Sequence, residues 1–177
     1  MAKSQWTIDP THSSIDFSVK HMMIAKVKGT FHAFEANIVA DAHDLTSADI
    51  QFTIDLNTVD TRNNDRDNHL RSADFFDIEK NPNLTFTATK ITKTDDGEYT
   101  IVGDVNLHGI TRSETFKASF EGAGKDPWGN EKVGFSAVGS IKRSDYGLTY
   151  NAALETGGVL IGDEVKISIE IEATQQG

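Results

Sequence analysis

The chain alternates between apolar and polar residues over most of its length, which is the pattern of half-buried β-strands. In residues 14–20, for example, Ile15, Phe17 and Val19 share one face and the residues between them are polar or charged. Seven further stretches alternate in the same way: 30–40, 48–58, 84–89, 99–107, 115–121, 133–141 and 165–172. The sequence therefore predicts about eight amphipathic strands.

The connections between these strands are short and rich in turn-forming residues. Asp95-Asp96-Gly97 and residues 126–130 both have the composition of tight turns. This arrangement favours an antiparallel barrel or sandwich over a parallel α/β sheet, whose strands would be apolar on both faces. Between Phe31 and Phe34 the apolar positions shift phase, which predicts a β-bulge within one long strand.

One segment, residues 63–77, interrupts the β-pattern with the densest mixture of charged and aromatic residues in the chain. It is predicted to form one short helical crossover segment that ends before Phe75-Phe76 and directs Leu70 toward a core. The two phenylalanines would then anchor the end of the helix against the barrel.

The charged side chains of this segment allow two interpretations. In a helix, Asp67 and Arg71 are four residues apart, as are Asp65 and His69, so each pair would interact. The segment is then an ion-pair cluster that fixes the crossover to the sheet, because charges removed from water must be paired. Alternatively it is a polar lid over the mouth of the barrel, with Arg66, Arg71 or His69 meeting the polar head of a ligand.

The interior of a closed barrel of about eight strands is either filled by side chains or holds one small ligand. Very small residues at predicted inward positions, namely Ala33, Ala88, Gly103, Ala118, Ala137 and Gly139, favour a ligand, whereas a filled and tapering barrel is the alternative. The inward positions are almost all apolar, so the ligand should be apolar too. The predicted pocket residues are Phe17, Val19, Phe31, Phe34, Ile38, Phe52, Ile54, Phe86, Ala88, Val105, Phe116, Ala118, Phe135, Ala137, Ile167 and Ile169.

Composition narrows the class of protein further. The 177 residues are enough for a single domain, 1–177, with its own core, and the absence of cysteine excludes a disulfide scaffold, an iron–sulfur protein and a thiol enzyme. A net charge of −10 argues against binding to nucleic acid or to anionic membrane surfaces. No apolar run is long enough for membrane insertion, and no leader precedes Trp6, which predicts a cytoplasmic protein. A leader that had already been removed would leave the same sequence, and the location would then be periplasmic.

The sequence contains no recognisable catalytic or metal-binding motif. Its six histidines form no HExxH or close His-x-His pattern, and no glycine-flanked elbow presents Ser13 or Ser144. We therefore predict no metal, no cofactor and no enzymatic activity. The alternative is an enzyme that acts through the cluster of Arg66, Asp67 and His69.

Six ordered motifs resemble the YceI-like family over residues 6–172. They are Asp9-Pro-Thr-His12-Ser13-Ser-Ile15-Asp-Phe17, Lys20-His21-Met22, Val27-Lys-Gly29-Thr-Phe31, Arg66-Asp67-Asn-His69-Leu70-Arg71-Ser-Ala-Asp74-Phe75-Phe76-Asp77, Leu107-His108-Gly109-Ile-Thr111 and Arg143-Ser-Asp145-Tyr146-Gly147. Tyr146 stands where many relatives have phenylalanine.

The resemblance implies an all-β, extended lipocalin-like antiparallel barrel that binds a polyisoprenoid, of the quinone or prenyl-phosphate type, or another long-chain lipid. Its role would be carriage, storage or sequestration, often as a homodimer, with no established catalytic activity. His21, Arg66, His69 and Arg143 are then candidate contacts for the head group, and internal pairs with Asp67, Asp74 and Asp145 are the alternative for the cluster. The enzyme of the alternative interpretation would act on an isoprenoid or a small acid through the cluster of Arg66, Asp67 and His69. A further alternative is a stress-response protein whose barrel is only a scaffold for partner contacts.

Overall fold

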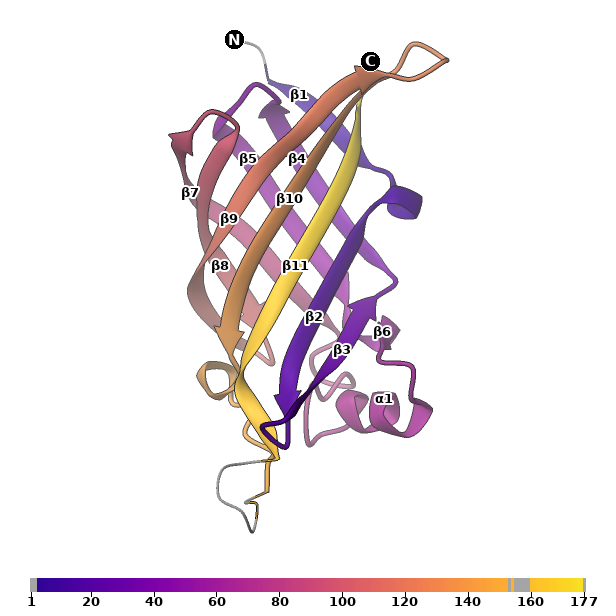
Figure 1. Ribbon diagram of the computed structural model, residues 1–177, viewed down its shortest axis with the longest axis vertical. Coiled ribbons are helices and arrows are strands. Elements are labelled where there is room, and N and C mark those ends of the chain that lie inside the picture. The colour runs from indigo at the N-terminus through magenta and orange to yellow at the C-terminus, as the bar shows by residue number, and fades with distance from the viewer. Residues whose placement is uncertain (1–2, 153, 155–159, 177) are drawn as a thin grey trace.

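The structure is a computed structural model that describes residues 3–152, 154 and 160–176. The strands in this part of the chain belong to one antiparallel sheet (Figure 1). They are β1 (Ser4–Ile8), β2 (Ser14–His21), β3 (Ala25–Phe31), β4 (Phe34–Asp41), β5 (Asp44–Asp55), β6 (Val59–Asp60), β7 (Asn83–Asp95), β8 (Glu98–Leu107), β9 (Ile110–Lys125), β10 (Glu131–Lys142) and β11 (Ile161–Gln175).

The sheet closes on itself because β1 pairs with both β4 and β11. The closed ring runs β1-β4-β5-β7-β8-β9-β10-β11, while β2, β3 and β6 continue the sheet from the other part of β11. The predicted antiparallel barrel of about eight strands with one short helix is therefore confirmed. Three residues of β1 pair with each neighbour, so backbone pairing closes the ring at the Trp6 end.

The pairing of β11 gives the barrel two distinct ends. Ile161, at the start of β11, pairs with His21 at the end of β2, whereas Gln175 pairs with Trp6 of β1. Figure 1 shows the chain termini at the Trp6 end, and the β2–β3 turn together with the helix at the other. We call these the terminal end and the helix end of the barrel.

The apolar phase shift near residue 32 is a strand boundary, and the predicted bulge is wrong. Strand β3 ends at Phe31 and pairs with β2 and β6, whereas β4 begins at Phe34 and pairs with β1 and β5. The apolar residues change phase because the chain leaves one part of the sheet and enters another. Register irregularities occur elsewhere, for example at Gly134/Phe135 in the pairing of β10 with β9.

Three strands, β1, β3 and the two-residue β6, were not among the eight predicted strands. Only three residues of β1, from Trp6 to Ile8, pair with β11, so its alternation is too short to recognise. In β3, Lys26 and Lys28 lie on the face opposite Val27 and Phe31, and Gly29 leaves a gap in the apolar face between those two residues. These strands are held by their neighbours in the sheet, which sequence periodicity does not report.

The described residues contain one α-helix, α1 (Asn64–Arg71), within the segment predicted to be helical. Asn63 caps its N-terminus, because the Asn63 side chain accepts a hydrogen bond from the Arg66 backbone N–H at 3.0 Å. The helix ends before Phe75, as expected, and Leu70 packs against the apolar core. Asp67 is its one buried residue, so α1 lies on the barrel through a polar contact as well as an apolar one.

Candidate functional site

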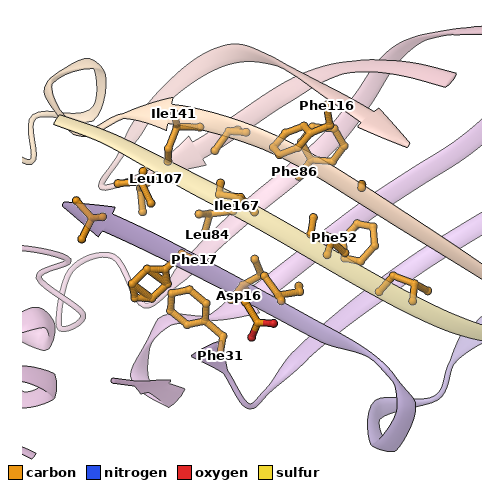
Figure 2. Close-up of a pocket in the computed structure, with 18 of the residues that line it drawn as sticks. Asp16, Phe17, Phe31, Phe52, Leu84, Phe86, Leu107, Phe116, Ile141 and Ile167 are labelled. Atoms are coloured by element: carbon orange, nitrogen blue, oxygen red, sulfur yellow. The ribbon is translucent and has the colours of Figure 1, made fainter. Parts of the chain in front are cut away.

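A cavity of about 430 Å³ lies inside the barrel, within the size range of ligand-binding pockets. Figure 2 shows aromatic side chains of five strands around it: Phe17 of β2, Phe31 of β3, Phe52 of β5, Phe86 of β7 and Phe116 of β9. The Phe86 and Phe116 rings meet edge to face with their centroids 5.4 Å apart. The wall of the cavity is therefore built from the inward positions of the alternating strands.

The cavity is elongated along the barrel. On β11 alone, every second residue from Val165 to Ala173 lines it, and Ile161 lines it at the helix end. Twelve residue steps of a strand cover roughly 40 Å, or roughly 30 Å along the axis of a barrel with an ordinary strand tilt. This length is comparable with the hydrocarbon thickness of a lipid bilayer.

Most of the apolar positions predicted from the alternation line this one cavity. The exceptions are Phe34 and Ala88, which lie outside it. Phe34, at the start of β4, packs against the core of the helix end, and Ala88 packs against the core of the terminal end. The residues that line the cavity are Phe17, Val19, Phe31, Ile38, Phe52, Ile54, Phe86, Val105, Phe116, Ala118, Phe135, Ala137, Ile167 and Ile169. That any of them contacts a ligand stays a prediction.

The small inward residues act in a different way from the one predicted. Gly103 and Gly139 do not line the cavity, because a phenylalanine ring covers each of them. A Cβ atom at Gly103 would lie within about 2.5 Å of the Phe86 ring, and one at Gly139 would lie equally close to the Phe116 ring. Each glycine therefore lets one phenylalanine ring lie close against the wall of the barrel. Space inside the barrel is kept by rings that lie against glycines, and of the six small residues predicted to face inward only Ala118 and Ala137 line the cavity.

Polar side chains gather around the cavity at its helix end. The four residues predicted to contact a head group, His21, Arg66, His69 and Arg143, all line it. Other residues in the lining at this end, which the alternation did not identify, are Lys20, Phe75, Phe76, Leu148, Tyr150 and Leu160. Lys20 lies near the end of β2 at a position that the alternation assigns to the polar face, and the others lie in loops and in the segment after α1, where no periodicity marks an inward position.

Arg143 organises the segment that follows β10. Its guanidinium group donates hydrogen bonds to the carbonyl oxygens of Leu148 at 2.9 Å, Tyr150 at 3.2 Å, Gly162 at 3.0 Å and Ile161 at 3.4 Å. Only 6% of the residue is exposed. Burial lowers the pKa of the guanidinium, which still remains charged at neutral pH. Arg143 thus holds the segment with Leu148 and Tyr150 to the start of β11 at this end of the cavity. The alternative prediction, a pair with Asp145, is not among the ion pairs of the described residues.

Arg66 and Asp67 are joined through Thr61. The Asp67 carboxylate accepts hydrogen bonds from the Thr61 backbone N–H at 2.9 Å and from its hydroxyl at 2.6 Å. Arg66 donates from Nε to the same hydroxyl oxygen and from Nη2 to the Thr61 carbonyl, both at 2.8 Å. Asp67 is buried and does not line the cavity, so its role is to fix α1 to the chain before it.

Replacing Asp67 by alanine is expected to lower the free energy of unfolding by about 2 kcal/mol, because the buried Thr61 N–H and hydroxyl lose their acceptor. Urea denaturation followed by circular dichroism measures the change. Asp65, also on α1 but exposed, supplies the matched control, since Asp65→Ala should change stability by less than about 0.5 kcal/mol. Equal effects of the two substitutions would contradict this role for Asp67.

His69 belongs to an aromatic cluster at the mouth. Its Nε2 atom lies 2.9 Å from an Asp74 carboxylate oxygen, and its ring meets those of Phe75 and Tyr150 edge to face at 4.9 and 4.8 Å. The Phe75 and Tyr150 rings are 5.1 Å apart. The cluster joins α1 to the segment held by Arg143. Arg66 and Asp67 share Thr61 as a partner, whereas His69 contacts Asp74, so the three side chains do not converge, and their geometry gives the predicted alternative of an enzymatic cluster no support.

The helix pairs predicted from the four-residue spacing are wrong. Arg71 donates to the carbonyl oxygens of Asn57 and Val59 and to the side chain of Asn68. Its predicted partner Asp67 is turned toward Thr61 instead. The preceding chain offers backbone acceptors to Arg71 and a buried donor, Thr61, to Asp67, which an isolated helix lacks, and these contacts replace the exposed pair along the helix.

Outside the cavity, Asp9, His12 and Glu172 bring three possible metal-ligating atoms within 4.8 Å of one another. No sequence motif pointed to this group, because Glu172 is far from Asp9 and His12 in the chain. His12 Nδ1 lies 2.9 Å from an Asp9 carboxylate oxygen and 3.5 Å from one of Glu172. The imidazole atom that would bind a metal is thus already used in an exposed hydrogen bond.

We expect His12 to titrate above its ordinary pKa of 6.5, because the hydrogen bond and the negative charge of Asp9 favour the imidazolium. The same contact lowers the pKa of Asp9. The contact is lost as pH rises through the raised pKa of His12 or falls through the lowered pKa of Asp9, and it is fully formed between about pH 4 and 6.5. Proton NMR of the His12 ring measures the pKa, which Asp9→Asn should lower. An unchanged titration in that variant would contradict the assignment.

Among the described residues, no helix has both the length and the hydrophobicity needed to cross a membrane.

Comparison with known proteins gives relatives over nearly the whole chain. A UPF0312 protein of Staphylococcus epidermidis is 43% identical, with 96% of each chain covered. A UPF0312 protein of Staphylococcus aureus is 39% identical over the same shares.

Solved structures show the same barrel. The crystal structure of the Campylobacter jejuni YceI protein is 34% identical, has a TM-score of 0.78 and covers 89% of this chain and 90% of that one. Burkholderia cenocepacia BcnA has a TM-score of 0.82 at 23% sequence identity, and the match covers 94% of this chain and 99% of that one. A polyisoprenoid binding domain from Saccharophagus degradans has a TM-score of 0.72 at 16% identity, and the match covers 98% of this chain and 99% of that one. These last two show likeness of fold.

Residues 6–173 match the YceI-like domain, from the first residue of the barrel that lines the cavity to the last. The resemblance inferred from the ordered motifs is thereby confirmed. The chain belongs to the YceI-like domain family.

Proposed function

We propose that this protein binds a long-chain isoprenoid lipid, of the quinone or prenyl-phosphate type, inside its barrel. The observation that carries the proposal is the apolar cavity that runs from Ile161 near the helix end to Ala173 near the terminal end. Each buried methylene group contributes about 0.8 kcal/mol, so a chain that fills this length binds well through burial alone.

The polar end of the cavity fits the head group of such a lipid. The Arg66 guanidinium and the His21 and His69 rings line this end, and Lys20 adds a fourth nitrogen-bearing side chain. Oxygen atoms of a quinone or a phosphate accept hydrogen bonds from such groups. The lipid is therefore oriented with its head at the helix end and its tail toward Trp6.

The relatives agree with this proposal but do not carry it. The domain from Saccharophagus degradans is described as polyisoprenoid binding, and its likeness to this chain is one of fold. The length of the cavity and its apolar lining support this ligand class. Carriage, storage and sequestration all require the same bound state, and a second copy of the chain is compatible with each.

Organic extraction of the purified protein followed by mass spectrometry tests the proposal. The expected result is one class of long-chain isoprenoid in near-stoichiometric amount. Repeated extraction without any lipid, from protein purified without detergent and unable to take up added isoprenoid, would overturn it.

Tryptophan fluorescence tests how the lipid lies. Trp6 lines the cavity at the terminal end, whereas Trp128 is 83% exposed in the β9–β10 turn, so Trp128→Phe leaves Trp6 as the single tryptophan. Isoprenoids of increasing length are then added to the delipidated variant. Only those that span the cavity are expected to change Trp6 emission, and an equal change with short and long chains would contradict the proposed orientation.

A further inference from the structure

The turn between β2 and β3 lies at the helix end of the barrel (Figure 1). Three consecutive apolar residues at this turn are exposed. Met22 is 43% exposed, Met23 50% and Ile24 84%. They form the convex tip of a two-stranded hairpin, residues 20–28, which we call the portal hairpin. Exposed apolar residues that occur singly are ordinary, but three in a row at one tip indicate a contact with another apolar phase.

The backbone of this tip is unfavourable for the residues it carries. Met22 and Met23 have φ angles of 54° and 62°, in the left-handed region that favours glycine and asparagine. The Ile24 N–H donates to the His21 carbonyl across this turn. Asn-Gly would suit such a turn better than two methionines, so hairpin stability does not explain their presence.

The portal hairpin is positively charged in a chain whose net charge is −10. Residues 17–34 contain Lys20, Lys26 and Lys28 and no acidic residue. Lys20 and Lys26 lie opposite each other in the β2–β3 ladder, an arrangement that disfavours pairing of the strands. No ion pair in the described part of the chain involves any of the three lysines.

The hairpin is continuous with the mouth of the cavity. The Met22 N–H donates to the Leu160 carbonyl at 2.7 Å, and Leu160 lines the cavity. Lys20 and His21, directly before the tip, line it as well. A surface that Met22, Met23 and Ile24 contact therefore lies beside the end of the cavity through which a ligand would pass.

We propose that the portal hairpin docks on the surface of an anionic lipid bilayer, so that a lipid passes between membrane and barrel without crossing water. This inference rests on the proposed function. Apolar side chains at the tip enter the interface while the lysines behind them meet anionic head groups, as in other interfacial segments. The acidic residues of the helix end, such as Asp65 and Asp74 near α1, limit the contact to the hairpin.

Substituting Met22→Asn together with Met23→Gly separates docking from folding. The change suits the left-handed backbone, so the melting temperature should stay the same or rise, while the apolar tip is lost. Partition of the full chain into vesicles of phosphatidylcholine with phosphatidylglycerol, measured by co-sedimentation, should fall at least about tenfold. The matched control is Trp128→Ser at the terminal end, which should partition like the unmodified protein.

Charge is tested with Lys26→Gln and Lys28→Gln in one variant, which should also weaken partition at least about tenfold and only in vesicles that contain phosphatidylglycerol. The variant Lys117→Gln with Lys166→Gln makes the same change in net charge on exposed positions of β9 and β11, and it should partition normally. An equal loss in both variants would show an effect of net charge and overturn docking by the hairpin.

Other results also overturn the inference. One is that the unmodified protein does not partition into the vesicles at low salt. The other is that the variant with Met22→Asn and Met23→Gly partitions as strongly as the unmodified protein. A dimer in analytical ultracentrifugation that dissociates in the Asn-Gly variant, without any vesicle binding, would assign the tip to a second copy of the chain. Lipid extraction from the same preparations keeps the two proposals apart, since bound isoprenoid without partition contradicts only docking, and partition without bound isoprenoid contradicts only the proposed function.

Discussion

Replacing Ala137 by phenylalanine is expected to lower the amount of bound lipid at least about tenfold while the barrel stays folded. Ala137 lines the cavity, opposite Ala118 on β9 and Ile169 on β11, about midway along the channel. A phenyl ring there would block the path of a chain, and excluding only two methylene groups weakens binding by about tenfold. Quantitative mass spectrometry of the extracted lipid measures the loss.

The neighbouring residue supplies the control. Val138 follows Ala137 in β10 but points to the outside of the barrel, where it is 54% exposed. Val138→Phe adds the same ring on the opposite face, so the bound lipid should be unchanged. Circular dichroism and the melting temperature show whether both variants fold. Unchanged lipid content in a folded Ala137→Phe variant would mean that the ligand does not occupy the middle of the barrel.

Replacing Arg143 by methionine is expected to lower the free energy of unfolding by about 3 kcal/mol, because four carbonyl oxygens lose their shared donor in a buried position. Urea denaturation measures the change. Since Arg143 also holds Tyr150 against His69 and Phe75, the mouth should open more readily and a bound lipid should exchange faster with vesicles.

Arg112 is the matched control for this substitution. It donates from Nε to the Asp145 carbonyl at 3.1 Å in an exposed position, so Arg112→Met should cost less than about 1 kcal/mol. Arg143→Lys keeps the charge but cannot reach both chain segments with one ammonium group, so it should recover only part of the stability. Full recovery by lysine would show that the charge of Arg143 matters more than the geometry of its hydrogen bonds.

Much of the fold and of the cavity wall could be predicted from period-two alternation. A residue such as Phe17 or Ile167 on the apolar side of a strand must face the interior of a closed barrel. The same argument does not place Phe34 or Ala88, which share the apolar side but lie beside other packed residues instead of the cavity. Alternation reports the face of the sheet that a residue occupies, and it does not report what fills the space in front of that face.

The mouth could be predicted less well, because its residues come from turns and from the helical segment. His69 was expected to pair with Asp65 along the helix, yet it meets Asp74 and the ring of Tyr150. Net charge likewise does not show how charge is distributed locally. The value of −10 averages over the chain, whereas the lysines of the portal hairpin are adjacent and lack acidic neighbours in the sequence.

The sequence by itself determined the barrel class, the inward faces of the strands and the family, since each depends on local alternation or on ordered motifs. Only the tertiary structure decided which partner each charged group takes and where the interior stays open. Thr61 reaches Asp67 because the chain folds back on α1, and Phe116 leaves room in the barrel because its ring lies over Gly139 on the next strand. Both contacts join residues whose distance in space is set by packing, which a one-dimensional pattern does not contain.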